Sequence, residues 1–301
     1  MRFPGYSRSA IAAGGLMDTV DEIDSDMAEA PAVQEVRVQS AGYLLELSLD
    51  WIVLRASENI HHLLSESHVT LIDEPLGRFV HAQALHDLRN LFSRLSGTTG
   101  IGRAYAVRLT DDDDVVDIAF HLVDGRVLLQ AVPSSGSFGE YFGSVGGLIA
   151  GLDNSRRQAL LDGGARRMRA LTGYDRVTLT CGEERAESSR GALASPVDPA
   201  DLPILIADTE PQAVSLFPRQ AADTSVHGAL MRAPHEADRR KLNEQGIRSM
   251  LRVPFSAGGL SCEFCCENRI ARAASFELHA AAELFAQMFA LQLALDKAAN
   301  R

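Results

Sequence analysis

The sequence predicts an α+β protein with two domains, each an antiparallel sheet flanked by helices. Its 301 residues are enough for two compact hydrophobic cores. Short segments with strand-type alternation are separated by turn residues, and segments with helical spacing lie between them. The composition, 46% hydrophobic and 23% charged, is that of an ordinary globular protein.

The first predicted domain covers residues 34–135 and follows an N-terminal segment, 1–33, that shows no sustained period and is expected to be flexible. Ser57 is placed to cap a helix start, and Asp124-Gly125 is a turn signal. The expected elements, in chain order, are a strand region at 36–50, a strand at 51–56, helices at 57–64 and 84–95, and strands at 103–109, 115–123 and 126–132.

The second predicted domain covers residues 156–301, after a linker and helix start at 136–155. Gly173 and Gly246 are expected to end helices, because glycine suits the left-handed position after a helix. A long, weakly patterned stretch, 182–228, is expected to be a functional or covered loop. The other expected elements are helices at 156–173, 235–246 and 275–299 and strands at 175–181, 247–255 and 259–268.

Charge and hydropathy exclude several classes of protein. A net charge of -11 and a pI near 5.3 argue against nucleic-acid binding, which needs clustered Lys and Arg. No uncharged apolar run approaches the ~20 residues of a membrane span. The first residues lack the apolar core of a secretory signal, so we expect a cytoplasmic protein with no membrane partner.

Two clusters suggest metal binding, but each has a simpler interpretation. Cys262 and Cys266 would share one face of a strand and Cys265 the other, so we expect buried thiols rather than a zinc site. With Cys181 they make four cysteines, which do not form a disulfide framework in a chain of this size. The run Asp111–Asp114 lacks EF-hand spacing and is expected at a charged hairpin tip. No nucleophile–base pattern is evident, so we expect no enzyme activity.

Six segments in the same order make residues 34–295 resemble the PAS–GAF pair of bacterial phytochromes. They are VQSAGYLLELSLDWIVLRASENIHHLL, FHLVDGRVLLQAVPSS, RALTGYDRV, LIADTEPQAVSLFP, GIRSMLRVPFSAGGLSCEFCCEN and ASFELHAAAELFAQMFA. The resemblance implies a PAS domain followed by a GAF domain. It also implies a figure-of-eight knot, in which the N-terminal segment passes through a loop here at about 204–232. Because the chain ends just after the expected GAF helix, we expect no PHY or histidine kinase domain of the kind found in such photoreceptors.

The resemblance further implies a bilin pocket, and most of the residues that bind the bilin in that family are replaced here. No cysteine precedes Cys181, and Met27 stands where the bilin-tethering cysteine is expected. Asp238 occupies the position of one pocket histidine, unless an insertion of three residues brings His235 there. Glu267 occupies the position of the second.

Two further pocket positions complete this relict site. Asp201 survives from the family's PASDIP motif, and Arg232 remains of two propionate-binding arginines, the other position being Ile204. Carboxylates in place of imidazoles would repel a propionate-bearing pigment, so we expect no cofactor. The ordinary interpretation of Asp238 and Glu267 is a solvated helix position and an exposed strand end, which we favour over a new site.

Function is expected to be sensory or regulatory, in signal transduction. The first hypothesis is a pigment-free module that forms a homodimer through the GAF helices, using the apolar face of 275–299, and contacts an unknown signalling protein. The second is a sensor of another small molecule, cationic in character, near Asp201, Asp238 and Glu267. The third is non-covalent binding of biliverdin or another tetrapyrrole.

Overall fold

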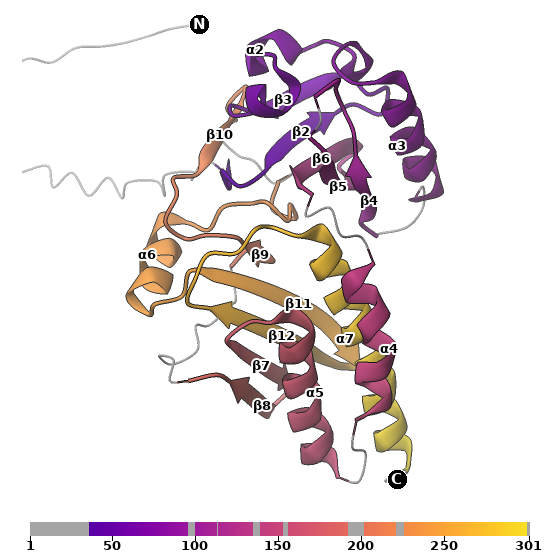
Figure 1. Ribbon diagram of the computed structural model, residues 1–301, viewed down its shortest axis with the longest axis vertical. Helices are drawn as coiled ribbons and strands as arrows, with labels where there is room; N and C mark the ends of the chain where they lie inside the picture. The colour runs from indigo at the N-terminus through magenta and orange to yellow at the C-terminus, as the bar shows by residue number, and fades with distance from the viewer. Residues whose placement is uncertain are drawn as a thin grey trace, which may run out of the picture. The chain divides into compact units, whose positions relative to one another are not determined.

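The computed structural model describes residues 36–95, 100–112, 114–134, 139–152, 156–191, 202–220 and 226–299. The predicted flexible segment 1–33 and Met27 lie outside these residues. The described chain contains two antiparallel sheets with flanking helices, which confirms the predicted α+β class (Figure 1).

The first sheet has seven strands in the order β1-β10-β3-β2-β6-β5-β4. Helix α3 packs its apolar stripe on this sheet and buries Ala84, Leu85 and Leu88. In chain order, its elements are β1 (Arg37–Val38), β2 (Tyr43–Leu47), β3 (Val53–Ser57), α1 (His61–Leu64), α2 (His68–Leu71), the 3-10 turn η1 (Leu76–Arg78), α3 (Ala82–Leu95), β4 (Gly102–Val107), β5 (Val116–Val123), β6 (Arg126–Pro133) and, from much later in the chain, β10 (Val214–Phe217).

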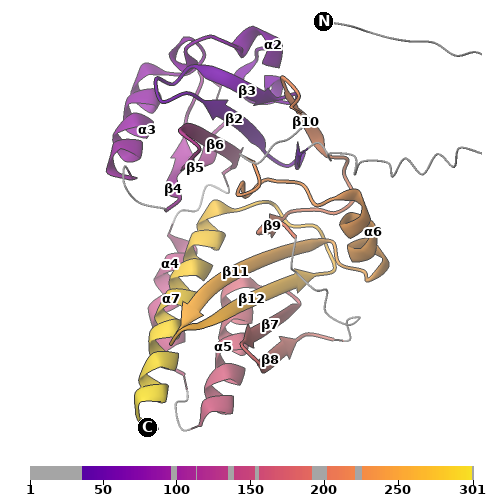
Figure 2. The ribbon, with the colours of Figure 1, turned by 180° about the vertical axis from the view of Figure 1, so that it is seen from behind.

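The second sheet has five strands in the order β8-β7-β12-β11-β9. Its helices α4, α5 and α7 pack against one another, and α5 and α7 also contact the sheet (Figures 1 and 2). The elements are α4 (Glu140–Ala150), α5 (Arg157–Thr172), β7 (Arg176–Cys181), β8 (Glu184–Ser189), β9 (Leu205–Ile206), α6 (Glu236–Glu244), β11 (Ser249–Ala257), β12 (Leu260–Asn268) and α7 (Phe276–Ala299).

Aromatic packing fixes α7 on the second sheet. The ring of Phe264 on β12 lies 5.9 Å from that of Phe285 and 5.5 Å from that of Phe289, centroid to centroid. Gly164 on α5 permits the close approach of α7, since a Cβ atom there would lie 2.5 Å from the ring of Phe289. The stretch Phe276–Asp296 is long and apolar enough to cross a membrane by length and composition alone, and 44% of its most apolar window is buried inside the protein.

The stretch 182–228 is not the featureless loop that the sequence predicts, because it contains β8, β9 and β10. Strand β10 leaves the second domain's segment and enters the first sheet between β1 and β3 (Figure 1). On its other side β1 meets the 231–233 segment, where Gln39 N donates to Met231 O at 2.9 Å and Ala233 N donates to Arg37 O at 2.8 Å.

The N-terminal strand β1 is therefore held between two arms of the loop predicted to encircle it. The rest of the predicted knot depends on residues before 36 and on 221–225, which lie outside the described part of the chain.

A polar cluster links β4 of the first sheet to α7. The Arg103 guanidinium contacts Nδ1 of His279 at 2.8 Å and donates to Oε2 of Glu283 at 2.7 Å. His279 is buried, and this desolvation, with the nearby charge of Arg103, lowers its pKa from 6.5 to about 3. His279 is therefore neutral in the folded protein at all but strongly acidic pH.

The lowered pKa of His279 predicts acid-dependent stability. The unfolded chain binds a proton at this histidine below pH 6.5, whereas the folded chain stays neutral down to about pH 3, so stability falls as the pH falls through this window. From pH 6.5 to about pH 5 the loss from this group is about 2 kcal/mol of unfolding free energy. Urea titrations at both pH values should show this loss in the wild type and a smaller one in His279→Gln. Equal losses in the two proteins would contradict the assignment.

Candidate functional site

Glu267, a position where the phytochrome resemblance implies a pocket histidine, lies on the face of β11 and β12 opposite to α5 and α7. Cys265 points to this face, whereas Cys262 and Cys266 join the core beneath the helices, as the strand alternation predicts. Leu242 of α6 packs on this face beside Cys265. The small apolar cluster formed there consists of Leu202, Ile206, Leu242, Ile247, Met250 and Cys265.

Glu267 lies on the same strand as Cys265 and is fully buried, so the predicted exposed strand end is wrong. Its carboxylate accepts a hydrogen bond from Nε of Arg176, which is only 2% exposed. The reason is register: β12 pairs with β7 so that Glu267 and Arg176 are direct cross-strand partners. A buried carboxylate is tolerated here because a buried guanidinium meets its charge.

The other predicted site residues lie on separate elements. Asp238 is half-buried in the first turn of α6, where a negative charge is favoured by the helix dipole, so a helix position is confirmed for it. Arg232 is 7% exposed and forms an isolated bridge with Val38 of β1. Asp201 lies outside the described residues.

The cysteines differ from the sequence expectation in one respect. Cys181 and Cys262 form a disulfide, since they are opposite each other in the β7–β12 register with Cα atoms 4.1 Å apart. The expectation of unpaired thiols is therefore wrong for this pair. Cys265 and Cys266 are free and buried, and burial raises the pKa of both thiols, which keeps them protonated. Within the described residues, no group of His, Cys, Asp or Glu could hold a metal ion.

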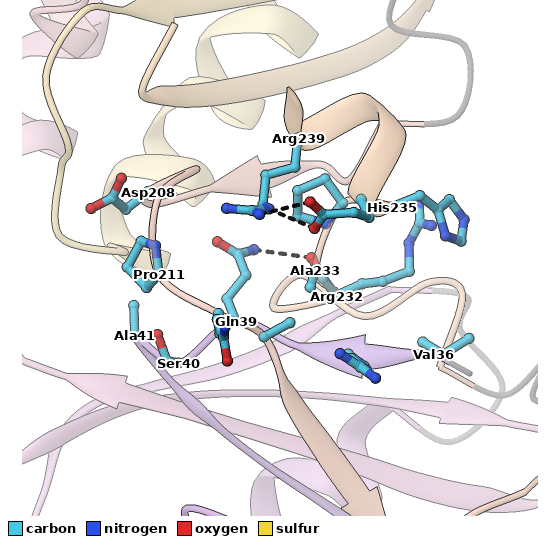
Figure 3. A pocket seen from close by; sticks show the side chains of 15 residues that line it. Val36, Gln39, Ser40, Ala41, Asp208, Pro211, Arg232, Ala233, His235 and Arg239 are labelled. Atoms are coloured by element: carbon cyan, nitrogen blue, oxygen red, sulfur yellow. Dashed lines mark hydrogen bonds and ion pairs between the residues drawn. The ribbon is translucent and has the colours of Figure 1, made fainter. Parts of the chain in front are cut away.

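A cavity of about 490 Å³ lies beside this region, and the sequence alone did not indicate it. Its walls come from three stretches, within 36–41, 208–213 and 232–239. In Figure 3, Gln39 reaches up from the first stretch, while Arg239 and His235 enter from the start of α6. Of the relict-site residues that the structure describes, this lining includes Arg232 but neither Asp238 nor Glu267.

A buried amide holds the three walls together. The Gln39 side chain is 5% exposed, and its Nε2 donates to Leu205 O at 2.7 Å and to Arg232 O at 3.0 Å (Figure 3). Its Oε1 accepts a hydrogen bond from Ala207 N at 2.9 Å. One side chain thus satisfies three backbone groups from segments that are far apart in the sequence, which fixes the geometry of the cavity.

The two carboxylates in the cavity wall are matched by arginines of the protein. Arg248 donates to Asp208, with Nη2 2.8 Å from Oδ1 and 3.0 Å from Oδ2. Arg239 donates to Glu236 through Nε at 2.9 Å and Nη2 at 2.8 Å, and these hydrogen bonds lower the pKa of Glu236. Arg239 Nη1 also donates to Thr209 O and Glu210 O, both at 3.1 Å, so its guanidinium is fixed against the wall.

The Arg176–Glu267 pair yields a stability prediction. Glu267→Gln keeps the shape of the side chain but removes the negative charge that faces the buried Arg176 guanidinium, so we expect the unfolding free energy to fall by about 3 kcal/mol. The exposed Glu236→Gln, which also removes a carboxylate bonded to arginine, is the matched control and is expected to stay close to wild type. Urea denaturation measures both variants. Equal stability of the two variants would show that the buried charge of Arg176 does not need Glu267 for the protein to keep its unfolding free energy.

No protein-family model matches this sequence, and no curated protein sequence is detectably similar to it. Solved structures are similar in fold. The chromophore-binding domain of a Stigmatella aurantiaca phytochrome is 20% identical, with a TM-score of 0.69, and the match covers 86% of this chain and 97% of that one. That of an unusual bacteriophytochrome from R. palustris is 20% identical, with a TM-score of 0.70 and coverage of 90% and 99%.

A second structure from S. aurantiaca, a bacteriophytochrome chromophore-binding domain variant in the Pr state, is 21% identical, with a TM-score of 0.71 and coverage of 88% and 98%. The photosensory core module of the S. aurantiaca phytochrome matches over 58% of its own length. At these identities the comparisons establish architecture alone. The chain has the α+β fold of the PAS–GAF chromophore-binding domains of bacterial phytochromes.

Proposed function

We propose that this protein is a phytochrome-related sensory or regulatory module that has lost covalent bilin binding and acts in the cytoplasm through protein–protein contacts rather than as an enzyme. The observation that carries the proposal is the buried Arg176–Glu267 pair, on the sheet face where the phytochrome resemblance implies a pocket histidine. The missing cysteine before Cys181 supports it independently.

The local physical chemistry of this face opposes a propionate-bearing tetrapyrrole. A tetrapyrrole bound against Glu267 would bring its propionates close to the carboxylate of that residue. Otherwise Arg176 would have to leave Glu267, its partner in a buried ion pair, to bind a propionate. The apolar contact of Leu242 with Met250 and Cys265 already occupies part of the space between α6 and the sheet. Non-covalent binding of biliverdin or another small molecule is the alternative function, and the same experiment tests the biliverdin form.

Co-expression with a biliverdin-producing haem oxygenase tests the loss of pigment binding. The S. aurantiaca chromophore-binding domain, prepared in parallel, is the positive control for pigment supply. We expect its far-red absorption band to survive gel filtration and denaturation, and this protein to show no such band because it lacks both tether and pocket imidazoles. A band that survives denaturation would contradict the proposal, and one that survives gel filtration only would favour the non-covalent alternative.

Exposed leucines on α7 support signalling through contact with another protein. Leu284, Leu291 and Leu295 are 38%, 66% and 64% exposed. Their spacing of seven and four residues places them along one stripe of the helix, separate from the buried Phe285 and Phe289. An exposed apolar stripe on a helix is typical of a helix–helix interface, so we propose that two copies associate through α7.

Leu291→Glu and Leu295→Glu together test this association. We expect wild-type protein to be a dimer by size-exclusion chromatography with light scattering, and the double variant to be a monomer, because each glutamate would lose its hydration in the interface. Leu49→Glu, at a site 56% exposed in the first domain, is the matched control and should remain dimeric. A monomeric wild type at high concentration, or a dimeric double variant, would contradict the interface.

A further inference from the structure

The cavity beside α6 is lined by polar side chains that hydrogen bonds hold in place, and the proposed pigment-free function does not use it. We propose that it binds a small anion that carries a carboxylate or phosphate group. Its volume, about 490 Å³, lies within the range of small-molecule sites. Among the described residues of the relict pigment pocket, its lining includes Arg232 but neither Asp238 nor Glu267, and it takes no residue from β11 or β12, the strands of the sheet face that carries Glu267.

The lining has a positive balance in a chain whose formal net charge is -11. Three arginines, Arg37, Arg232 and Arg239, stand against two carboxylates, Asp208 and Glu236. Both carboxylates are bonded to arginine, and the partner of Asp208, Arg248, lies outside the lining and also pairs with Glu210. A cationic ligand would therefore have to displace an internal ion pair, whereas an anion would add to an existing positive field.

The donors that would meet an anion come from two walls. Arg37 lies on β1, and His235 immediately precedes α6. A guanidinium group has several N–H donors in a planar fork, so arginines that have protein contacts can still present donors to a carboxylate or phosphate. The imidazole of His235 can add a further hydrogen bond.

The same walls explain why the site would be specific. Gln39 joins the β1 segment to 205–207 and to Arg232, so the opposing donors are held at a fixed separation before any ligand binds. Two carbonyl groups and a carboxylate fix the Arg239 guanidinium. It therefore acts on an anion through its positive charge rather than by moving to contact it. Preorganised charge of this kind discriminates anions by size and shape.

Calorimetric titration of the full chain with inorganic phosphate and, separately, with succinate tests the proposal, at ionic strength held constant with sodium chloride. The phosphate and carboxylate arms distinguish the two anion classes. We expect saturable binding in at least one arm, weakened about tenfold or more in Arg37→Gln/His235→Gln because the positive charge of Arg37 and the imidazole of His235 are removed from the lining. Arg94→Gln, an exposed arginine on α3 outside the lining, should bind as wild type does.

A second variant guards against a folding defect in the first. Ala213→Phe leaves every charge in place and fills part of the cavity, so it should abolish saturable binding while thermal unfolding remains cooperative. The proposal fails if neither anion binds saturably to the wild type. It also fails if Arg37→Gln/His235→Gln and Ala213→Phe both retain wild-type affinity, since the anion would then bind elsewhere.

Discussion

The pairing of β10 with β1 and β3 is the constraint on which the arrangement of this protein depends. Through Arg37↔Ser215 and Leu216↔Ser57, a segment that follows the second domain's first strands becomes part of the first domain's sheet. Gln39 continues this seam with side-chain hydrogen bonds to 205–207 and Arg232. These strand pairings and Gln39 hydrogen bonds, rather than either domain's own core, position the polar walls of the cavity and the segment that leads into α6.

Elements with strong local signals could be predicted from the sequence. Gly173 and Gly246 have positive φ values of 69° and 71°, as the glycine rule for helix ends requires. The β11–β12 hairpin followed from two alternating runs around a glycine pair. Strands β9 and β10 did not, because they have only two and four residues and their partners are far away in the sequence. Their strand conformation comes from tertiary pairing, which no local pattern records.

The site was less predictable for the same physical reason. A glutamate at the end of a strand indicates exposure unless its partner is known, and the partner of Glu267 is 91 residues earlier in the chain. Cys181 and Cys262 are likewise separated by 81 residues, and only the register of β7 against β12 brings them together. The family resemblance singled out Arg232, which the structure places beside β1, and Asp238, which it places on α6. It gave no indication of Gln39, whose role depends entirely on long-range contacts.

The place of β10 in the first sheet also has a consequence for biosynthesis. On the ribosome, β2, β3 and β6 emerge well before β10, so the nascent first domain presents the backbone of β3 as an open edge for much of translation. Open edges readily recruit strands from other chains. Fragments cut between the two domains would keep that edge permanently bare, and would therefore tend to aggregate in spite of an intact hydrophobic core.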